Sequence, residues 1–206
     1  MWPQWIERQL VRRGIGDERV LEAMARVPRE AFVAEDLRDQ AYDDRPLPVG
    51  HGQTISQPYM VALTCEALAL QGDERVLDIG TGSGYAAAVL SELAREVHTI
   101  ERIPELAETA RAALLATGYE TVQVHEGDGA LGLAAFAPYD GVAVAAAGPD
   151  IPPAVWAQLR EGGRIALPLR TGRRSQQLCV IERAATGPRL LASVPASFVP
   201  LIRNET

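Results

Sequence analysis

Three glycines and two carboxylates, close together in the chain, have the types and spacing of a ligand-binding turn. Asp78 lies in a short apolar stretch, and Gly80, Gly82 and Gly84 follow it at alternate positions. Because glycine has no Cβ and tolerates positive φ, such a turn lets the backbone approach a ligand closely. Glu101 ends the next apolar stretch, where a carboxylate can accept hydrogen bonds from ribose hydroxyls. The spacing predicts a site for a ligand that contains a nucleoside.

Two interpretations compete for this turn. The dinucleotide-binding fingerprint, G-x-G-x-x-G, would place its third glycine at position 85, which is occupied by Tyr85. The sequence instead reads D-x-G-x-G-x-G, which resembles motif I of the S-adenosylmethionine-dependent methyltransferases. A tight turn between a strand and a helix, with no ligand, is the alternative. The acid before the glycines and Glu101 after them favour a ligand.

The residues around this turn predict a β-α-β unit. Residues 76–79 are typical of a short buried strand, and residues 97–101 form a second apolar stretch of the same kind. Between them, helix-forming residues run from Tyr85 to about Arg95. The glycines therefore join the end of a strand to the beginning of a helix.

Strands and helices continue to alternate after Glu101, which predicts an α/β fold. Further strands are expected at about 122–126, 139–145 and 164–167. Helices are expected at 104–117 and from 152 to about 160, with Gly162-Gly163 after the second. This alternation predicts a doubly wound, mostly parallel, Rossmann-like sheet. Residues 177–182 and 190–194 flank a turn and predict an antiparallel hairpin at one edge.

A third segment is expected beside the glycine turn and Glu101. In doubly wound sheets, ligands bind at the carboxyl ends of the strands, and Asp128-Gly129 follows the third strand. Asp128 could accept a hydrogen bond from an exocyclic amine, and Gly129 would leave room for a flat ring. An ordinary turn role explains Asp128 equally well.

The N-terminal residues predict a helical cap followed by a loop. About forty residues of amphipathic helix come first, with Asp17 as the N-cap of the second helix. Residues 42–58 are rich in proline and glycine and predict an irregular loop, either functional or disordered. Thr54 and Ser56 precede a helix at 60–70, whose N-terminus favours anions. An N-cap role for Ser56 is the structural alternative. We therefore divide the chain into residues 1–72, cap and loop, and residues 73–206, the core of one compact unit.

The composition excludes several classes of protein. With 206 residues and 47% hydrophobic residues, the chain can form a core, which excludes a disordered protein. A net charge of −7 without a basic run argues against nucleic-acid binding. No signal peptide and no apolar run of membrane-spanning length are recognised, so we expect a cytoplasmic protein without membrane contact. The two cysteines, Cys65 and Cys179, are expected to be buried free thiols. The histidines, His51, His98 and His125, are too far apart in the sequence to form a metal-binding motif, so no metal site is predicted.

Nearly the whole chain resembles the protein-L-isoaspartate (D-aspartate) O-methyltransferase family. The matching segments are RQLVRRGIGDERVLEAMARVPREAF (8–32), LPVGHGQTISQPYM (47–60), motif I at 78–85, motif II at 139–153, residues 159–168 and FVPL (198–201). The GHGQTISQP part is the most specific, because motif I alone indicates only a class I methyltransferase. The family places its last two strands in an order swapped relative to most class I enzymes.

The resemblance implies an activity and a set of site residues. It implies methyl transfer from S-adenosylmethionine to the free α-carboxylate of L-isoaspartyl or D-aspartyl residues, which starts repair of damaged proteins through a succinimide. Ser56 would be the catalytic residue, holding the acceptor carboxylate with the surrounding backbone. The other substrate-binding residues would be His51, Gly52, Thr54 and Ile55. The cofactor-binding residues would be Asp78, Gly80, Thr81, Gly82, Ser83, Gly84, Glu101, Asp128 and Gly129.

The chemistry implied by the resemblance needs few catalytic groups. A free α-carboxylate, with a pKa of about 3.5–4, is ionised at neutral pH and needs no general base. Catalysis can then consist of alignment and exclusion of water, with Ser56 orienting the acceptor. We expect the enzyme to act as a monomer on isoaspartyl-containing proteins and peptides.

The sequence departs from the family at two positions and leaves alternatives open. Ala145 stands where many relatives have threonine, and Ile202 where some have threonine. The first departure concerns the cofactor site. One alternative is methylation of an ordinary aspartate in a dedicated peptide, forming an aspartimide. Another is a cofactor-binding domain without catalytic activity, against which the intact Ser56 segment and motif I argue.

Overall fold

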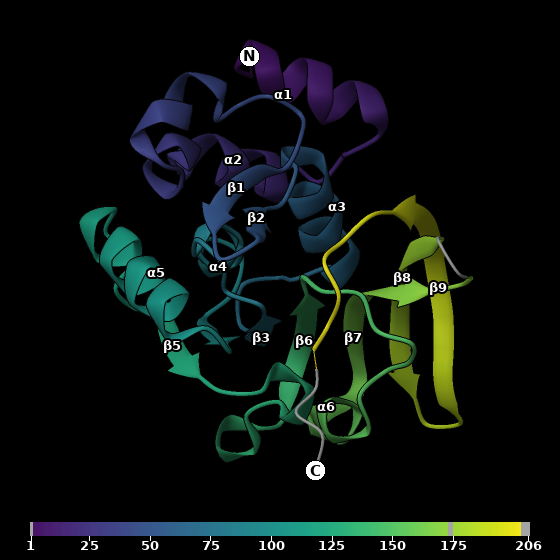
Figure 1. Cartoon of the computed structure of the whole chain (residues 1–206). Helices are drawn as coiled ribbons and strands as arrows, with labels where there is room; N and C mark the ends of the chain where they lie inside the picture. Colours follow the sequence, from purple (N-terminus) through teal and green to yellow (C-terminus); the bar gives the residue numbers. More distant parts are fainter. Residues whose placement is uncertain (1, 173–174, 203–206) are drawn as a thin grey trace.

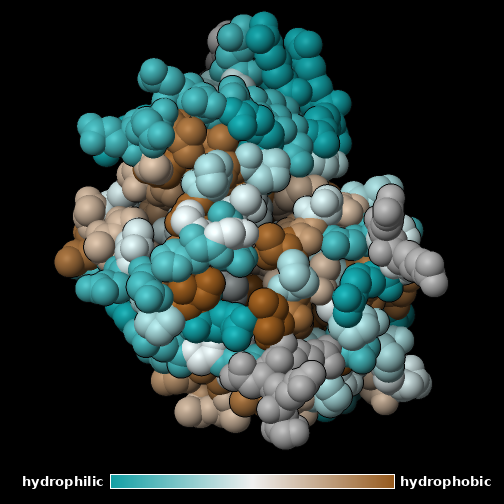
Figure 2. Space-filling view, in the orientation of Figure 1, coloured by the Kyte–Doolittle hydropathy of each residue, from teal (hydrophilic) through white to brown (hydrophobic). Residues whose placement is uncertain are grey.

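The computed structural model describes residues 2–172 and 175–202, which form helices around a central sheet (Figure 1). The N-terminal helices lie at one end of the molecule, above the carboxyl edge of the sheet, and their outer surface is hydrophilic (Figure 2). In the part of the chain that the structure describes, no helix has the length and apolar character needed to cross a membrane.

The cap consists of short helices, as predicted. Its elements are α1 (Gln4–Gln9), α2 (Glu18–Arg26) and three 3₁₀ helices at Val11–Arg13, Arg29–Phe32 and Glu35–Gln40. Asp17 is the N-cap of α2, because its Oδ1 accepts a hydrogen bond from the N–H of Arg19 at 2.9 Å. Leu10 and Met24 are fully buried between these helices and the rest of the protein.

The segment at 42–58 is more ordered than predicted. It contains an antiparallel hairpin of β1 (Leu47–Gly50) and β2 (Gln53–Ile55), followed by α3 (Pro58–Leu68). The prediction of an irregular loop was wrong here. Gly50, His51 and Gly52 all adopt positive φ, which reverses the chain tightly enough for Leu47 to pair with Ile55. Both of these side chains are buried.

The central sheet has seven strands, and those from β5 to β7 are parallel. In spatial order the strands are β5 (Gln123–Glu126), β4 (Glu96–Glu101), β3 (Arg75–Ile79), β6 (Tyr139–Val144), β7 (Leu159–Arg170), β8 (Gln176–Ala184) and β9 (Gly187–Ala196). Strands β8 and β9 form the predicted antiparallel hairpin and follow β7 in chain order. The chain order reverses between β3 and β6, which makes this pair the topological switch point.

Two element boundaries differ from the prediction. Helix α4 (Tyr85–Ser91) ends before Arg95, and α6 (Pro153–Gln158) gives way to a strand that already begins at Leu159. The register of β6 against β7 shifts between Tyr139 and Gly141, so the glycine pair 162–163 lies within an irregular part of β7. Gly162 has φ +77, a conformation that favours glycine.

The two faces of the sheet belong to separate hydrophobic clusters. Val76 and Ala143 pack with the cap and with α3 and α4 on one face. Leu77, Val142 and Ile165 pack with α6 on the other face. This alternation is the period-two pattern of strands covered on both sides. Helix α5 (Pro104–Ala116) lies beside β4 and β5. The cap and the sheet share one hydrophobic cluster. The division of the chain between residues 72 and 73 stays a prediction.

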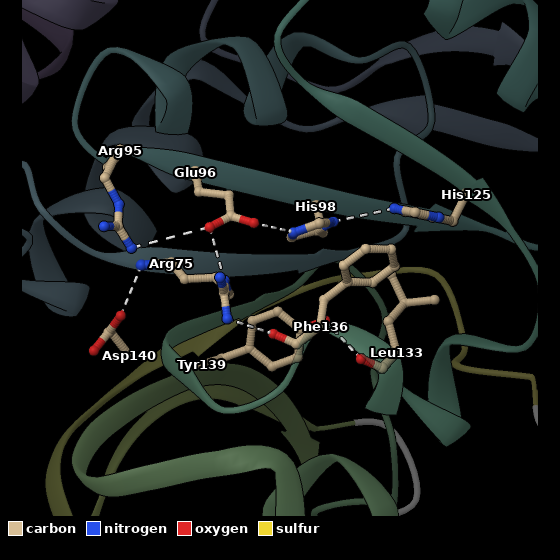
Figure 3. A network of polar contacts seen from close by, with 9 residues as sticks. All are labelled: Arg75, Arg95, Glu96, His98, His125, Leu133, Phe136, Tyr139 and Asp140. Carbon is tan, nitrogen blue, oxygen red and sulfur yellow. Dashed lines mark hydrogen bonds and ion pairs between the residues drawn. The ribbon is translucent and has the colours of Figure 1, made fainter.

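A partly buried polar network joins β3, β4 and β5 (Figure 3). His98, which is fully buried, lies with its Nε2 2.9 Å from Glu96 Oε1 and its Nδ1 3.1 Å from His125 Nε2. Its ring stacks on Phe136 with a centroid distance of 4.1 Å. Arg75 donates to Glu96 at 2.8 Å from the neighbouring strand. This network fixes the start of β4, the strand that ends in Glu101.

Candidate active site

Three neighbouring cavities open near the carboxyl ends of β3 and β6, at the switch point. We call them the ligand cavity, about 310 Å³, the narrow pocket, about 30 Å³, and the outer groove, about 790 Å³. Ala145, the residue after β6, lines all three. Hydrophobic side chains gather on this face below the hydrophilic cap (Figure 2). Because Ala145 borders all three cavities, ligands bound in two of them would lie next to each other.

The ligand cavity brings together several of the predicted residues. The members of the predicted set that line it are His51, Thr54, Gly80, Gly82, Glu101 and Gly129. They come from the β1–β2 hairpin and from the ends of β3, β4 and β5. The volume lies within the range of about 300–1,000 Å³ that small-molecule pockets usually have.

Glu101 connects the glycine turn to the end of β4. It is 6% exposed, and its Oε2 accepts a hydrogen bond from the N–H of Gly82 at 2.9 Å. Its Oε1 accepts from the N–H groups of Arg102 and Ile103 at 2.9 and 3.0 Å. A carboxylate offers about four lone-pair positions, so Glu101 can still accept from a ligand hydroxyl. The predicted contact with a ribose is therefore chemically available.

Further hydrogen bonds hold the glycine turn against β4. Gly80, with φ +97, donates its N–H to the carbonyl of Ile100 at 2.9 Å. The buried hydroxyls of Thr81 and Thr99 lie 2.7 Å apart. Gly84, with φ +91, is the N-cap of α4, where a Cβ would lie 3.2 Å from Leu114. Thr81, Ser83 and Gly84 thus shape the turn from inside, and none of them lines the ligand cavity.

Asp78 faces the narrow pocket and does not line the ligand cavity. It is 1% exposed and accepts a hydrogen bond from the Thr99 hydroxyl at 2.8 Å. The pKa of Asp78 is raised to about 7: burial is the main cause, the hydrogen bond from Thr99 opposes it, and the nearby charge of Glu101 adds to it. Cys65, a buried free thiol as predicted, lines the same pocket, and burial raises its pKa. Asp78 therefore lies where the glycine turn meets α3.

Asp128 and Gly129 occupy the end of β5, as predicted. Asp128 caps a short 3₁₀ helix, because its Oδ1 accepts from the N–H of Ala130 at 2.9 Å. Gly129 is so tightly placed that a Cβ would lie 2.4 Å from Ile79 Cγ2. The buried side chain of Gln158 donates to the carbonyl of Leu131 and accepts from the N–H of Leu133, both at 2.8 Å. The sequence contains no pattern that singles out Gln158 for this role.

Ser56 lies between the narrow pocket and the outer groove. It is not the N-cap of α3: that position is Gln57, whose side chain makes no capping hydrogen bond. The structural alternative for Ser56 is therefore wrong. Thr54 lines both the ligand cavity and the outer groove, whereas Ile55 is buried in the core and supports the hairpin. Gly52 lies in the exposed turn and lines none of the three cavities.

Arg29 holds the Ser56 segment from below, a role that sequence reasoning missed. Its side chain is fully buried, donates to the carbonyl of Ser56 at 2.8 Å and donates to the carbonyl of Ala41 at 2.6 Å. The guanidinium carbon also lies 4.7 Å from the centre of the Tyr85 ring. Burial lowers the pKa of Arg29, since no carboxylate is among its described hydrogen-bond partners. The sequence signal that could have pointed to Arg29 was its position within segment 8–32, which matches the family.

A C-terminal segment completes the ligand cavity. Residues 199–202 line it, and Ala147 pairs with Pro200 beyond the end of β6. The N–H of Ala147 donates to Val199, and the N–H of Leu201 donates to Ala147, at 2.8 and 2.9 Å. The FVPL match was the sequence signal for this segment. Ile202, one of the two departures from the family, therefore lies at the cavity wall.

Comparisons with known proteins point to one family. The family model described as protein-L-isoaspartate(D-aspartate) O-methyltransferase matches residues 4–206. The chain is 58% identical over 198 residues to a protein-L-isoaspartate O-methyltransferase 2 of Marinobacter nauticus, covering 96% of this chain and 90% of that one. It is 53% identical over 195 residues to a protein-L-isoaspartate O-methyltransferase of Myxococcus xanthus, covering 93% and 92%.

Two solved structures have the same fold. A protein-L-isoaspartate O-methyltransferase, 29% identical, aligns with a TM-score of 0.81 and covers 93% of this chain. This chain spans only 63% of the length of that structure. A Plasmodium falciparum structure described as a β-aspartate methyltransferase in complex with S-adenosyl-L-homocysteine also has a TM-score of 0.81, with 97% of both chains covered. At 24% identity, the second structure supports the fold alone.

Proposed function

The chain belongs to the protein-L-isoaspartate(D-aspartate) O-methyltransferase family, and from this premise we propose its reaction and the roles of its residues. It transfers a methyl group from S-adenosylmethionine to the free α-carboxylate of L-isoaspartyl, or D-aspartyl, residues in damaged proteins and peptides. One observation carries the assignment: the ligand cavity behind the glycine turn and the groove beside Ser56 meet at Ala145. A methyl donor and a carboxylate acceptor held there would be in contact.

The residues of the ligand cavity fit S-adenosylmethionine. Glu101 would accept from the ribose, and Gly129 would border the adenine. Asp128, which precedes Gly129 and does not itself line the cavity, would act from beside it. Gly80 and Gly82 would pass the amino-acid end, which is why positive φ and the absence of a Cβ matter there. Asp78 would act from the adjoining narrow pocket. Thr81, Ser83 and Gly84 would keep the turn in shape.

The acceptor side needs an orienting group more than a base. When bound, S-adenosylmethionine supplies an electrophilic methyl group, to which the acceptor oxygen bonds as the carbon–sulfur bond breaks. The acceptor carboxylate is already ionised, since its pKa is about 3.5–4. Ser56 would donate its hydroxyl proton to one carboxylate oxygen in a hydrogen bond and so orient the other. The buried positive charge of Arg29, bonded to the Ser56 carbonyl, favours an anion at this place.

The product explains the repair role. In the methyl ester, the backbone nitrogen of the following residue displaces methanol and closes a succinimide, which opens partly to ordinary aspartate. The negative charge of the chain and its lack of a basic run support a protein that does not bind nucleic acid, and we propose a cytoplasmic monomer. Size-exclusion chromatography with light scattering would test the oligomeric state.

Labelled methyl transfer tests the function directly. An isoaspartyl peptide and its aspartyl twin should be compared, and only the isoaspartyl form should be methylated. Ser56→Ala should lower kcat/KM by about ten- to a hundredfold, which corresponds to loss of one hydrogen bond to a charged group. Cofactor affinity should stay nearly unchanged, and so should the melting temperature, since Ser56 does not cap α3. Methylation of the aspartyl twin would instead favour the dedicated-peptide alternative.

A further inference from the structure

The outer groove has one charged side chain. Of the described residues that line it, Arg13 alone is charged, and the others are apolar or uncharged polar. Ser56 and Arg13 both line the groove, together with the last residues of β9 and the segment that follows it. With a volume of about 790 Å³, it has room for residues on either side of an acceptor group at Ser56. A peptide that fills this groove around Ser56 therefore lies near the guanidinium.

Arg13 is fixed over the wall of the groove. Its guanidinium carbon lies 3.4 Å from the centre of the Tyr59 ring, a cation–π contact. Its Nη1 pairs with Asp44, whose carboxylate also accepts from the Gln57 side chain at 2.7 Å and from the N–H of Tyr59 at 3.3 Å. These contacts hold the side chain in place at little further entropic cost on binding.

The arginine still faces solvent and keeps unused donors. Its side chain is 41% exposed, and its one described hydrogen bond engages Nη1. A guanidinium carries five N–H donors in a planar fork, so a second carboxylate can bind it. Asp44 does not line the groove, since its carboxylate is enclosed by the donors of Arg13, Gln57 and Tyr59. A bound peptide therefore meets the positive partner of this pair first.

We propose that Arg13 determines acceptor specificity: it favours isoaspartyl peptides with an acidic residue next to the isoaspartate. This inference rests on the proposed function. The chain carries a net charge of −7, so acidic peptides are otherwise repelled, and the local cation offsets that repulsion where the peptide lies. Because the pair is half exposed, the preference should be about threefold to fivefold in kcat/KM and should weaken with added salt.

The test uses three isoaspartyl peptides that differ only in the residues flanking the isoaspartate, which are glutamate, lysine or alanine. The wild-type enzyme should prefer the glutamate peptide over the lysine peptide. Arg13→Gln should abolish or reverse this preference, because Asp44 then loses its counter-charge. Arg13→Lys keeps the charge and should retain most of the preference. For each variant, the rates on the glutamate and lysine peptides are expressed relative to its rate on the alanine peptide.

Arg12→Gln is the matched control. Arg12 precedes Arg13, carries the same charge, is 70% exposed and does not line the groove. This variant should discriminate between the peptides as the wild type does. Equal rates on the glutamate and lysine peptides in the wild type, or an unchanged preference in Arg13→Gln, would overturn the proposal. Failure to methylate even the alanine peptide would instead contradict the proposed function.

Discussion

The cofactor side and the acceptor side of the site are built in opposite ways. The glycine turn is tied to β4 by backbone hydrogen bonds and by the buried side chains of Glu101, which accepts from Gly82, and Thr99, which contacts Thr81. The Ser56 segment follows a hairpin with an exposed turn, and one buried cation, Arg29, anchors it. A cofactor has one shape, whereas acceptor peptides differ in sequence. The difference suggests that rigidity is concentrated where the ligand is constant and that the acceptor side can adapt.

Removal of Arg29 should separate the two sides most clearly. Arg29→Met leaves the buried carbonyls of Ala41 and Ser56 without a donor, which should lower the free energy of unfolding by about 2–4 kcal/mol. Methyl transfer should fall strongly, while the affinity for S-adenosylhomocysteine of the folded variant stays near the wild-type value. Urea unfolding, calorimetry and steady-state kinetics check these outcomes. The control is Arg26→Met, since Arg26 is exposed and pairs with Glu92. Equal losses on both sides would show that they are not independent.

Removal of Glu101 should instead weaken the cofactor side of the site. Glu101→Ala removes the acceptor of three backbone N–H groups as well as the proposed ribose contact. Cofactor affinity should fall by about 1–3 kcal/mol. Calorimetric titration with S-adenosylhomocysteine measures this loss, and Glu105→Ala, at the start of α5, serves as the control. Affinity equal to that of the wild type would mean that the ribose is held elsewhere.

Asp78, where the two sides meet, should produce a smaller effect that depends on pH. Its folded pKa is raised to about 7 by burial, whereas an unfolded aspartate titrates near ~3.9. Between these values the folded chain binds more protons than the unfolded chain. The free energy of unfolding should therefore decrease as pH rises, by at most about 1.4 kcal/mol per pH unit.

Asp78→Asn should remove this part of the pH dependence, because the amide oxygen can still accept from Thr99. Urea unfolding of both proteins at about pH 4.5, 5.5 and 6.5 should show a difference that grows with pH in favour of the variant. Asp73→Asn, at an exposed position, is the control. Parallel curves for Asp78→Asn and wild type would show that Asp78 titrates in the folded protein at its ordinary pKa.

Much of the fold could be predicted because its signals are local. Apolar stretches of strand length, helix formers after Tyr85 and glycines between them are properties of near neighbours in the chain. The sheet, the glycine turn and the C-terminal edge hairpin were confirmed for this reason. The β1–β2 hairpin was missed, since its pairing depends on a turn in which His51, a non-glycine residue, adopts φ 51.

The sequence by itself indicated the class of ligand, through the resemblance of D-x-G-x-G-x-G to motif I, and the backbone that approaches it, because glycine at alternate positions allows positive φ there. The tertiary structure alone decided which side chains became buried and what they then hold. Arg29 reaches the Ser56 carbonyl 27 positions along the chain, and Gln158 clamps the loop after Gly129. Asp78, predicted at the cofactor site, faces a pocket shared with Ser56. Burial and partners of polar groups depend on segments distant in sequence, and these set both the cost and the role of each charge.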